Sequence, residues 1–328
     1  MKVISAFLVV LIHTTADSFS TFQSDWWLAN TLDSIARMSV PLFFMTSGFF
    51  LLNNNDITLQ FFTKRLRKLL LPFLAWSMIY IIYSNHLMNK SLSLSQLSSL
   101  LQKPAYFHLW FFYTLIPIYL VTPLIKKSIT NMDKQTSLYL IVLWLTFSLL
   151  PDFIYNLSLL WSKGEPRLGM DSTHLMIAML GYYIIGGIVK KHNTITIKLS
   201  FFLFLIATAL TSILTYFYSM SFNKPTQAFY VYYSPLVSIS AISFFTLVLN
   251  SSSIPKKAEL TIRKLSSLSL GIYFIHPLVI DFIKIHLYSI NVTYNTASMS
   301  FFIAMLCFGI SALICYCVRK TPIINRLI

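Results

Sequence analysis

The prediction of this fold starts from the stretch Lys2-Val-Ile-Ser-Ala-Phe-Leu-Val-Val-Leu-Ile-His13. The residues between its two polar ends are apolar except for Ser5. Eleven helical steps of about 1.5 Å span roughly 16 Å and make about three turns, so Lys2 and His13 lie on one helix face. If Lys2 marks the inner edge of a hydrocarbon core about 30 Å thick, His13 lies near its middle.

A histidine at that depth has two interpretations. An ionisable residue inside a membrane is expensive, so it normally faces protein or a water-filled cavity and marks a functional site. Alternatively, a neutral ring is buried and bonded to a neighbouring backbone carbonyl, which is the least costly way to hide a titratable group. The first helix alone leaves both interpretations open.

The composition predicts an all-α, polytopic integral membrane protein. Of the 328 residues, 56% are hydrophobic and 11% are charged, against about 25% charged residues in a typical soluble domain. Apolar segments run almost from end to end, so residues 1–328 are expected to form a single membrane domain. The three cysteines lie in the last apolar segment and predict neither a disulfide framework nor a metal site.

About ten transmembrane helices are expected from apolar runs of spanning length. They lie near residues 3–16, 36–53, 69–86, 108–125, 136–151, 173–189, 199–218, 231–250, 267–288 and 298–318. We interpret the first as a true span because no small-residue cleavage site follows it. The segment 24–35 is too polar to span and is expected to form a short amphipathic helix on the outer surface.

The loop charges predict the orientation. Alternate connections and the two ends of the chain hold most of the basic side chains and only three acids, Asp56, Asp133 and Glu259. The other connections balance seven basic against seven acidic side chains. The positive-inside rule therefore places both termini in the cytoplasm. The net charge of +15 thus indicates topology and contact with anionic membrane lipid, with no nucleic acid as partner.

The expected outer loops are rich in aromatic residues, which either form an interfacial belt or face sugars. They include Trp26, Trp27, Tyr106, Trp161, Tyr230 and Tyr232. The chain contains no phosphate-binding glycine loop, dinucleotide fingerprint, nucleophile elbow or zinc-protease motif. ATP-driven transport and soluble-type hydrolase chemistry therefore lose support.

Several polar residues in or near the spans are candidates for a site, each with a plainer alternative. Asp17 follows His13 by one turn and either bonds its ring or is the first solvated residue of the loop. His276 precedes the helix-bending Pro277 and either lines a cavity or bonds a carbonyl freed by the kink. Arg37 is expected at the outer end of the second span, where an arginine commonly snorkels to the surface. His108 and His286 are expected at interface depth, where a structural role is favoured.

Five motifs in this order resemble the membrane acyltransferase 3 family. The first is a basic residue and a histidine in the first helix, as in Lys2 and His13. The others are Ser39-Val-Pro-Leu-Phe-Phe-Met-Thr-Ser-Gly-Phe, Arg65-Leu-Arg67-Lys68-Leu-Leu-Leu-Pro-Phe, His108-Leu-Trp-Phe and Gly271-Ile-Tyr-Phe-Ile-His-Pro. The likeness runs from residue 2 to about 280, and the nearest group is the bacterial O-acetyltransferases of surface polysaccharides such as enterobacterial common antigen.

This resemblance implies a donor, an acceptor and a location. The donor is acetyl-CoA, or another short acyl-CoA, in the cytoplasm. The acceptor is a polysaccharide or lipid-linked glycan on the outer side of a bacterial inner membrane, and no metal takes part. The family usually has arginine where this chain has Lys2 and Lys68, and the lysines keep the charge but lose the bidentate fork.

The resemblance also implies the site residues. Acyl-CoA phosphates are expected to bind Lys2, Arg65, Arg67 and Lys68. His13 is expected to act as general base or to accept the acyl group itself, with Asp17 as its partner. The lesser candidates for shaping the cavity or steadying the oxyanion are Arg37, Trp110, Tyr273 and His276.

Two other functions are compatible with these sequence features. A transporter or flippase of a lipid-linked sugar also needs a polar path through the membrane, but it favours discontinuous spans in matched halves, and the sequence shows no such pair. A structural subunit of a larger complex is the third possibility, and the intramembrane polar groups argue against it.

Overall fold

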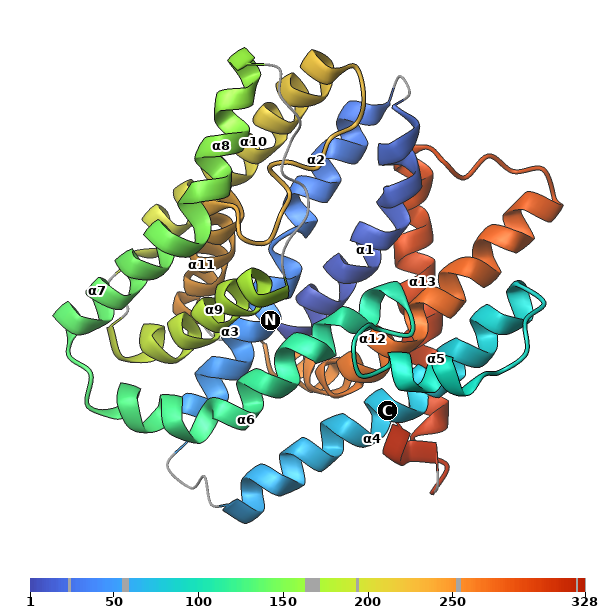
Figure 1. Ribbon diagram of the computed structural model, residues 1–328, viewed down its shortest axis with the longest axis horizontal. Coiled ribbons are helices and arrows are strands. Elements are labelled where there is room, and N and C mark those ends of the chain that lie inside the picture. Colours follow the sequence, from blue (N-terminus) through green and yellow to red (C-terminus); the bar gives the residue numbers. More distant parts are fainter. Residues whose placement is uncertain are drawn as a thin grey trace.

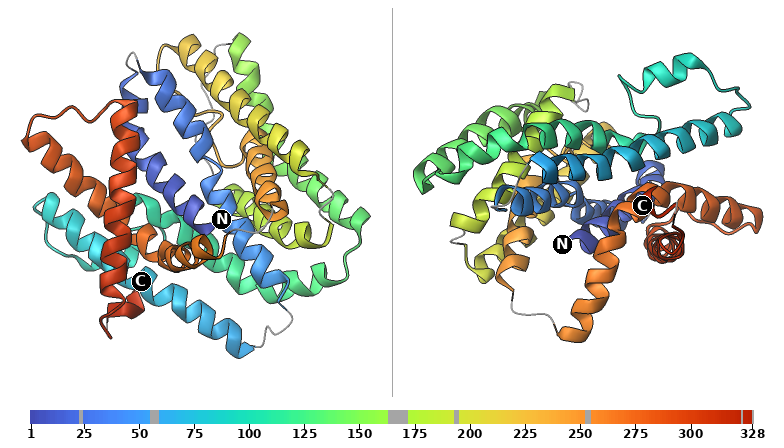
Figure 2. Two further views of the ribbon diagram at one scale, coloured as in Figure 1. Left: turned by 180° about the vertical axis from the view of Figure 1, so that it is seen from behind. Right: turned by 90° about the horizontal axis from the view of Figure 1, so that it is seen from below.

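The computed structural model describes residues 1–22, 25–54, 59–162, 172–192, 195–251, 255–322 and 324–327, and no β-strand occurs among them. The α-helices are α1 (Lys2–Thr21), α2 (Trp26–Ala36), α3 (Ser39–Leu52), α4 (Leu59–Leu87), α5 (Leu94–Ser99), α6 (Trp110–Thr130), α7 (Lys134–Trp144), α8 (Leu150–Ser162), α9 (Ser172–His192), α10 (Ile197–Phe222), α11 (Pro235–Asn250), α12 (Lys256–Ser289) and α13 (Ala297–Val318). Three short helices complete the fold: η1 (Phe107–Leu109), the π-helix η2 (Leu145–Leu149) and η3 (Ile324–Leu327). The segment that carries α5 projects from the bundle (Figure 2).

Nine helical segments of the described chain are long and apolar enough to cross a membrane, which confirms the predicted all-α, polytopic class. The expected span 231–250 differs, because its helix α11 begins only at Pro235 and has 16 residues. The loop before it turns into the bundle, where Tyr230 and Tyr233 are buried. Hydropathy alone does not separate such a buried aromatic loop from the first turns of a spanning helix.

The prediction of a surface helix over 24–35 is wrong. α2 packs inside the bundle against α1, α10 and α13. Trp26 Nε1 donates to the backbone oxygen of Phe19 at 2.7 Å, and Asn30 Nδ2 donates to that of Ser212 at 2.9 Å. Because these polar groups find partners on neighbouring helices, a segment too polar to face lipid is accommodated within the bundle.

α1 lies in the interior of the bundle, with α2, α3, α12 and α13 packed against it (Figures 1 and 2). The buried hydroxyls of Thr14, Thr15 and Ser18 donate to backbone carbonyls within the helix, as when Thr15 donates to the Leu11 carbonyl at 2.8 Å. We name the Lys2 end of α1 the inner end and the Thr21 end the outer end, after the orientation predicted from the loop charges. A helix enclosed in this way presents His13 to protein and not to lipid.

Two glycines allow α3 and α9 to cross in direct backbone contact. A Cβ added at Gly48 would lie 1.8 Å from the carbonyl oxygen of Tyr183, and one at Gly186 would lie 2.0 Å from that of Met45. Small residues permit such close crossings in membranes, where van der Waals contact supplies much of the association energy. This crossing fixes α3, which begins two residues after Arg37, against the rest of the bundle.

Replacing Gly48 with alanine is expected to destabilise the fold by about 1–3 kcal/mol, because the backbones must separate to admit a methyl group. The measurement is thermal unfolding in detergent. Gly309→Ala is the matched control, since a Cβ there meets no atom within 4 Å and alanine favours a helix over glycine. Equal stability of the two variants would contradict the observed crossing.

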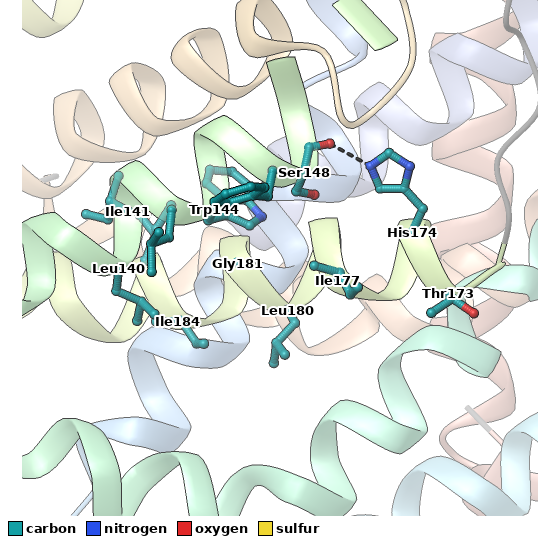
Figure 3. A pocket seen from close by; sticks show the side chains of 13 residues that line it. Leu140, Ile141, Trp144, Ser148, Thr173, His174, Ile177, Leu180, Gly181 and Ile184 are labelled. Atoms are coloured by element: carbon teal, nitrogen blue, oxygen red, sulfur yellow. Dashed lines mark hydrogen bonds between the residues drawn. The ribbon is translucent and has the colours of Figure 1, made fainter. Parts of the chain in front are cut away.

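The fifth span is longer than the predicted 136–151. α7, η2 and α8 form one continuous run from Lys134 to Ser162, with the π-helix just before Pro151. On the facing helix α9, the His174 Nε2 atom lies 2.6 Å from the backbone oxygen of Ser148. Figure 3 shows this bond at one end of a pocket between the two helices. An interruption of this kind often marks a functional region.

Candidate active site

Three histidine rings meet beside α1. The ring centroids of His13 and His276 are 5.2 Å apart with planes 25° from parallel, and those of His276 and His108 are 5.4 Å apart at 78°. His108 and His276 are buried, whereas His13 is partly exposed and lines a cavity. Within the described ranges, no group of three histidine, cysteine, aspartate or glutamate side chains is arranged to hold a metal ion. The His13 and His276 rings stack, and the His108 ring meets that of His276 edge to face.

Pro277 explains how the His276 ring is held. A proline lacks the N–H that would bond the carbonyl four residues earlier, here that of Tyr273. His276 Nδ1 lies 2.7 Å from this carbonyl oxygen and 3.3 Å from that of Ile272. Because carbonyls only accept, the neutral ring carries its proton on Nδ1 and leaves Nε2 unprotonated. The structure therefore shows the bond to the freed carbonyl, and the buried His276 ring contacts that of His13 without lining a described cavity.

His13 lines a cavity of about 310 Å³ towards the outer end of α1, together with Asp17, Asp281 and Lys284. Lys284 Nζ donates to Asp17 Oδ2 at 2.6 Å. Among the described residues no hydrogen bond joins Asp17 to His13, so the expected direct bond is absent. The ammonium group of Lys284, on the facing helix α12, donates a hydrogen bond to the Asp17 carboxylate instead. Asp17 and His13 share the cavity but not a bond.

Asp281 provides a second carboxylate in the same cavity. Its Oδ2 accepts hydrogen bonds from the hydroxyls of Tyr83 at 2.9 Å and Tyr106 at 3.1 Å. Burial, reinforced by the nearby Asp281 charge, raises the pKa of Tyr106, so this phenol keeps the proton that it donates. The cavity thus holds one imidazole, two carboxylates and one ammonium group, which suits a ligand rich in hydroxyls.

Arg37 and Trp110 line a different cavity, of about 280 Å³. Arg37 does not snorkel: its side chain is 11% exposed, and Nη2 lies 2.6 Å from the Asp33 carboxylate. Its guanidinium carbon lies 4.7 Å from the centre of the Tyr230 ring, and Trp110 stacks on Tyr232 with centroids 5.6 Å apart. Trp110 begins α6 two residues after His108, whose ring belongs to the histidine cluster. This second cavity therefore combines aromatic faces with a buried ion pair near the histidine cluster.

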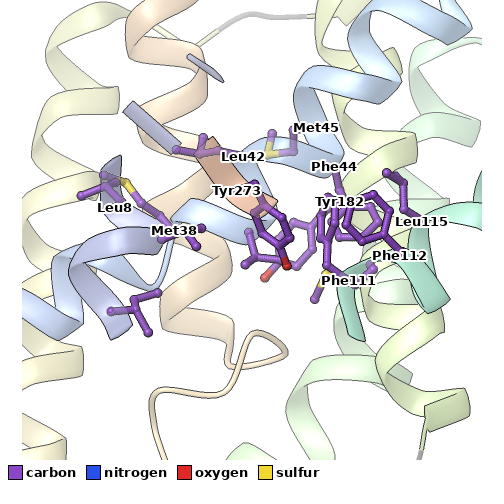
Figure 4. Close-up of a cluster of buried hydrophobic side chains, with 14 of the residues drawn as sticks. Leu8, Met38, Leu42, Phe44, Met45, Phe111, Phe112, Leu115, Tyr182 and Tyr273 are labelled. Atoms are coloured by element: carbon purple, nitrogen blue, oxygen red, sulfur yellow. The ribbon is translucent and has the colours of Figure 1, made fainter. Parts of the chain in front are cut away.

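Tyr273 connects α12 with the start of α6. Its hydroxyl donates to the backbone oxygen of His108. Its ring lies beside those of Phe111 and Phe112, with centroid distances of 5.3 and 5.7 Å (Figure 4). Because the hydroxyl is already bonded to protein, Tyr273 shapes the site by holding His108 in place.

The inner end of α1 opens into a third cavity, of about 310 Å³, lined by Lys2, Thr46 and Ser266 with aromatic side chains. Arg65, Arg67 and Lys68 are exposed on α4 and do not line it in the described chain. Lys2 therefore lines this cavity, whereas Arg65, Arg67 and Lys68 lie at the surface.

Comparison with known proteins identifies the family. A family model described as an acyltransferase domain, that of the acyltransferase 3 family, matches residues 1–319. The chain belongs to the acyltransferase 3 family. A curated relative from Enterococcus faecalis named amino-acid racemase is 27% identical over 304 residues, which cover 85% of this chain and 40% of the relative. The chain thus spans less than half of that relative, and the racemase name belongs to the longer protein. No solved structure matches significantly.

Three residues at the site were not expected there from the sequence: His108, Asp281 and Lys284. The first was expected to be structural because of its depth. Asp281 and Lys284 follow Pro277 in an apolar helix at spacings of four and three residues, so the three positions share one face. That periodicity is the signal that would have found them.

Proposed function

We propose that this acyltransferase moves an acetyl group from acetyl-CoA in the cytoplasm to a hydroxyl of a surface polysaccharide, or of its lipid-linked precursor, outside a bacterial inner membrane. The observation that carries the proposal is the position of His13. It lies on a buried helix with the Lys2 cavity at one end and the carboxylate-lined cavity towards the other. A donor and an acceptor on opposite sides can therefore approach one imidazole.

In the direct route, His13 removes the proton of the acceptor hydroxyl as its oxygen attacks the thioester carbonyl. A C–O bond forms, the C–S bond breaks, and the departing CoA thiolate takes up the proton. In the two-step route, a ring nitrogen of His13 attacks first and holds the acetyl group before the hydroxyl receives it. Both routes give the same products, an acetyl ester of the acceptor and CoA with a free thiol.

Two cations are placed to assist this reaction. Attack on the thioester places negative charge on the carbonyl oxygen, and fixed positive groups lower the energy of that state. Lys284 lines the cavity that holds His13, and Arg37 lines the cavity of Trp110 and Tyr232. Each is also bonded to a carboxylate, which fixes its position before the substrates arrive.

The test uses membranes that contain the protein, acetyl-CoA labelled in the acetyl group, and polysaccharide from the same cell. We expect label in the polysaccharide that mild alkali releases as acetate, because esters are cleaved by base. Membranes without the protein are the control. Labelled succinyl-CoA in a parallel reaction decides between the acyl groups. An absence of alkali-labile label with every donor would refute the proposal.

Replacing Lys2 with methionine is expected to raise the KM for acyl-CoA about 10-fold or more with a smaller change in kcat, since a charge-assisted hydrogen bond to phosphate contributes about 1.5–3 kcal/mol. Arg65→Met is expected to act in the same direction. Lys198→Met, an exposed lysine at the start of α10, is the control for general loss of positive charge. A KM unchanged by Lys2→Met would remove Lys2 from the donor site.

A further inference from the structure

A groove of about 640 Å³ opens between the α7–η2 run and α9. Its walls are almost wholly apolar and include Ile141, Phe147, Ile177 and Leu180 (Figure 3). Phe147 is 74% exposed and Ile177 is 47% exposed, so the groove opens on the outside of the bundle. In a membrane protein such a surface faces hydrocarbon.

Polar groups gather at one end of this groove. His174 and Thr173 lie at the start of α9, and His174 Nδ1 is 3.6 Å from the Asp152 carboxylate. Ser148 Oγ and Trp144 Nε1 are buried and have no hydrogen-bond partner within the described chain. An orphaned buried polar atom carries a free-energy cost of about 1–3 kcal/mol unless something bonds it. The groove is thus polar towards the outer end and apolar towards the membrane centre.

The polar end of the groove adjoins the cavity that holds Arg37. The rings of His174 and Tyr233 are 5.1 Å apart, and Tyr233 lines the Arg37 cavity together with Leu175, the residue after His174. That cavity offers the stacked pair of Trp110 and Tyr232, and aromatic faces of this kind pack against the apolar faces of sugars. An amphiphilic groove therefore adjoins an aromatic cavity whose Trp110 begins α6, two residues after His108 of the histidine cluster.

We propose that the acceptor is a lipid-linked glycan that enters from the outer leaflet between α7 and α9. Its lipid chain occupies the groove beside Ile177 and Phe147, and its first sugar extends from the Arg37 cavity to the cavity that His13 lines. The inference rests on the proposed function and narrows its acceptor to the lipid-linked form. A free polysaccharide needs the cavity but not the groove, and a phospholipid needs the groove but not the aromatic cavity.

The test compares two acceptors in vesicles that contain the purified protein. Both are hexosamines joined through a diphosphate, one to a long isoprenoid chain and the other to a two-isoprene chain. We expect kcat/KM for acetyl transfer to be at least about 10-fold higher with the long chain. Equal values would overturn this inference and leave the proposed function standing. Transfer to neither acceptor, with label still entering free polysaccharide, would also overturn it.

A matched pair of variants locates the lipid chain. Ile177→Trp fills the groove, and it is expected to reduce the preference for the long chain by about 10-fold. Ile206→Trp makes the same change on α10, where the side chain is 42% exposed and does not line the groove, and it should keep the wild-type preference. The level of each protein in the membrane is measured in parallel. An equal preference in both variants would overturn the proposed position.

Crosslinking supplies a readout that does not depend on turnover. A long-chain acceptor with a photoreactive group on its chain is expected to label peptides within 140–148 and 173–185. Unlabelled acceptor should compete, whereas excess phosphatidylethanolamine should compete at least about 10-fold less effectively. Equal competition by the phospholipid would show that ordinary membrane lipid fills the groove, and this result would overturn the proposal.

Discussion

Replacing His13 with alanine is expected to lower kcat for acyl transfer by about 10²–10⁴-fold, the usual contribution of a positioned general base. The His13 ring lines the cavity that holds Asp17 and Asp281, and it also contacts the ring of His276. Its loss removes the proton acceptor in the direct route and the acyl carrier in the two-step route. Transfer of label from acetyl-CoA to acceptor measures the effect.

His286→Ala is the matched control for this variant. His286 lies on an exposed position near the outer end of α12, away from the imidazole cluster. We expect it to retain wild-type turnover and expression. Binding of acyl-CoA should persist in His13→Ala, because the Lys2 cavity is at the other end of the helix. Unchanged turnover in His13→Ala would remove this residue from the chemistry.

Replacing Asp33 with alanine is expected to destabilise the protein by about 3–5 kcal/mol, because it leaves a buried guanidinium without its counter-charge. Asp33 is 2% exposed and Arg37 is 11% exposed, so water screens neither charge effectively. Thermal unfolding in detergent measures the loss. This stability effect is larger than the one of about 1–3 kcal/mol expected from alanine at Gly48.

The double variant Asp33→Leu with Arg37→Met separates stability from function. Removing both charges is often neutral or stabilising, because neither is left unpaired. We expect it to recover most of the lost stability while acyl transfer stays impaired, since the positive charge that we propose for stabilising the oxyanion is gone. A double variant that is as unstable as Asp33→Ala would contradict this account of the pair. Recovery of full turnover would remove Arg37 from catalysis.

The apolar runs of spanning length were sufficient to predict the all-α, polytopic architecture. Helical rise and membrane thickness are fixed quantities, so the depth of His13 follows from counting residues. The effect of Pro277 was equally predictable, because a proline always leaves the carbonyl four residues earlier without its donor. In the structure, His276 Nδ1 donates to this carbonyl, that of Tyr273.

Contacts between helices far apart in the sequence were not predictable. Asp17 pairs with Lys284, 267 residues away, because α1 and α12 are neighbours, and no local pattern states which helices meet. The same reason explains α2, which looked like a surface helix until its partners on α1 and α10 were known. His108 appeared to lie at the interface because its depth was judged without the rings of His276 and Tyr273.

The central claim is that donor and acceptor reach His13 from opposite sides of one membrane. Sealed vesicles with the protein in a single orientation test it most directly, with labelled acetyl-CoA confined to the side of the Lys2 cavity and acceptor to the other. We predict acetylated acceptor outside while the membrane stays impermeable to acetyl-CoA. Label on the acceptor only when both substrates share one compartment would contradict the claim.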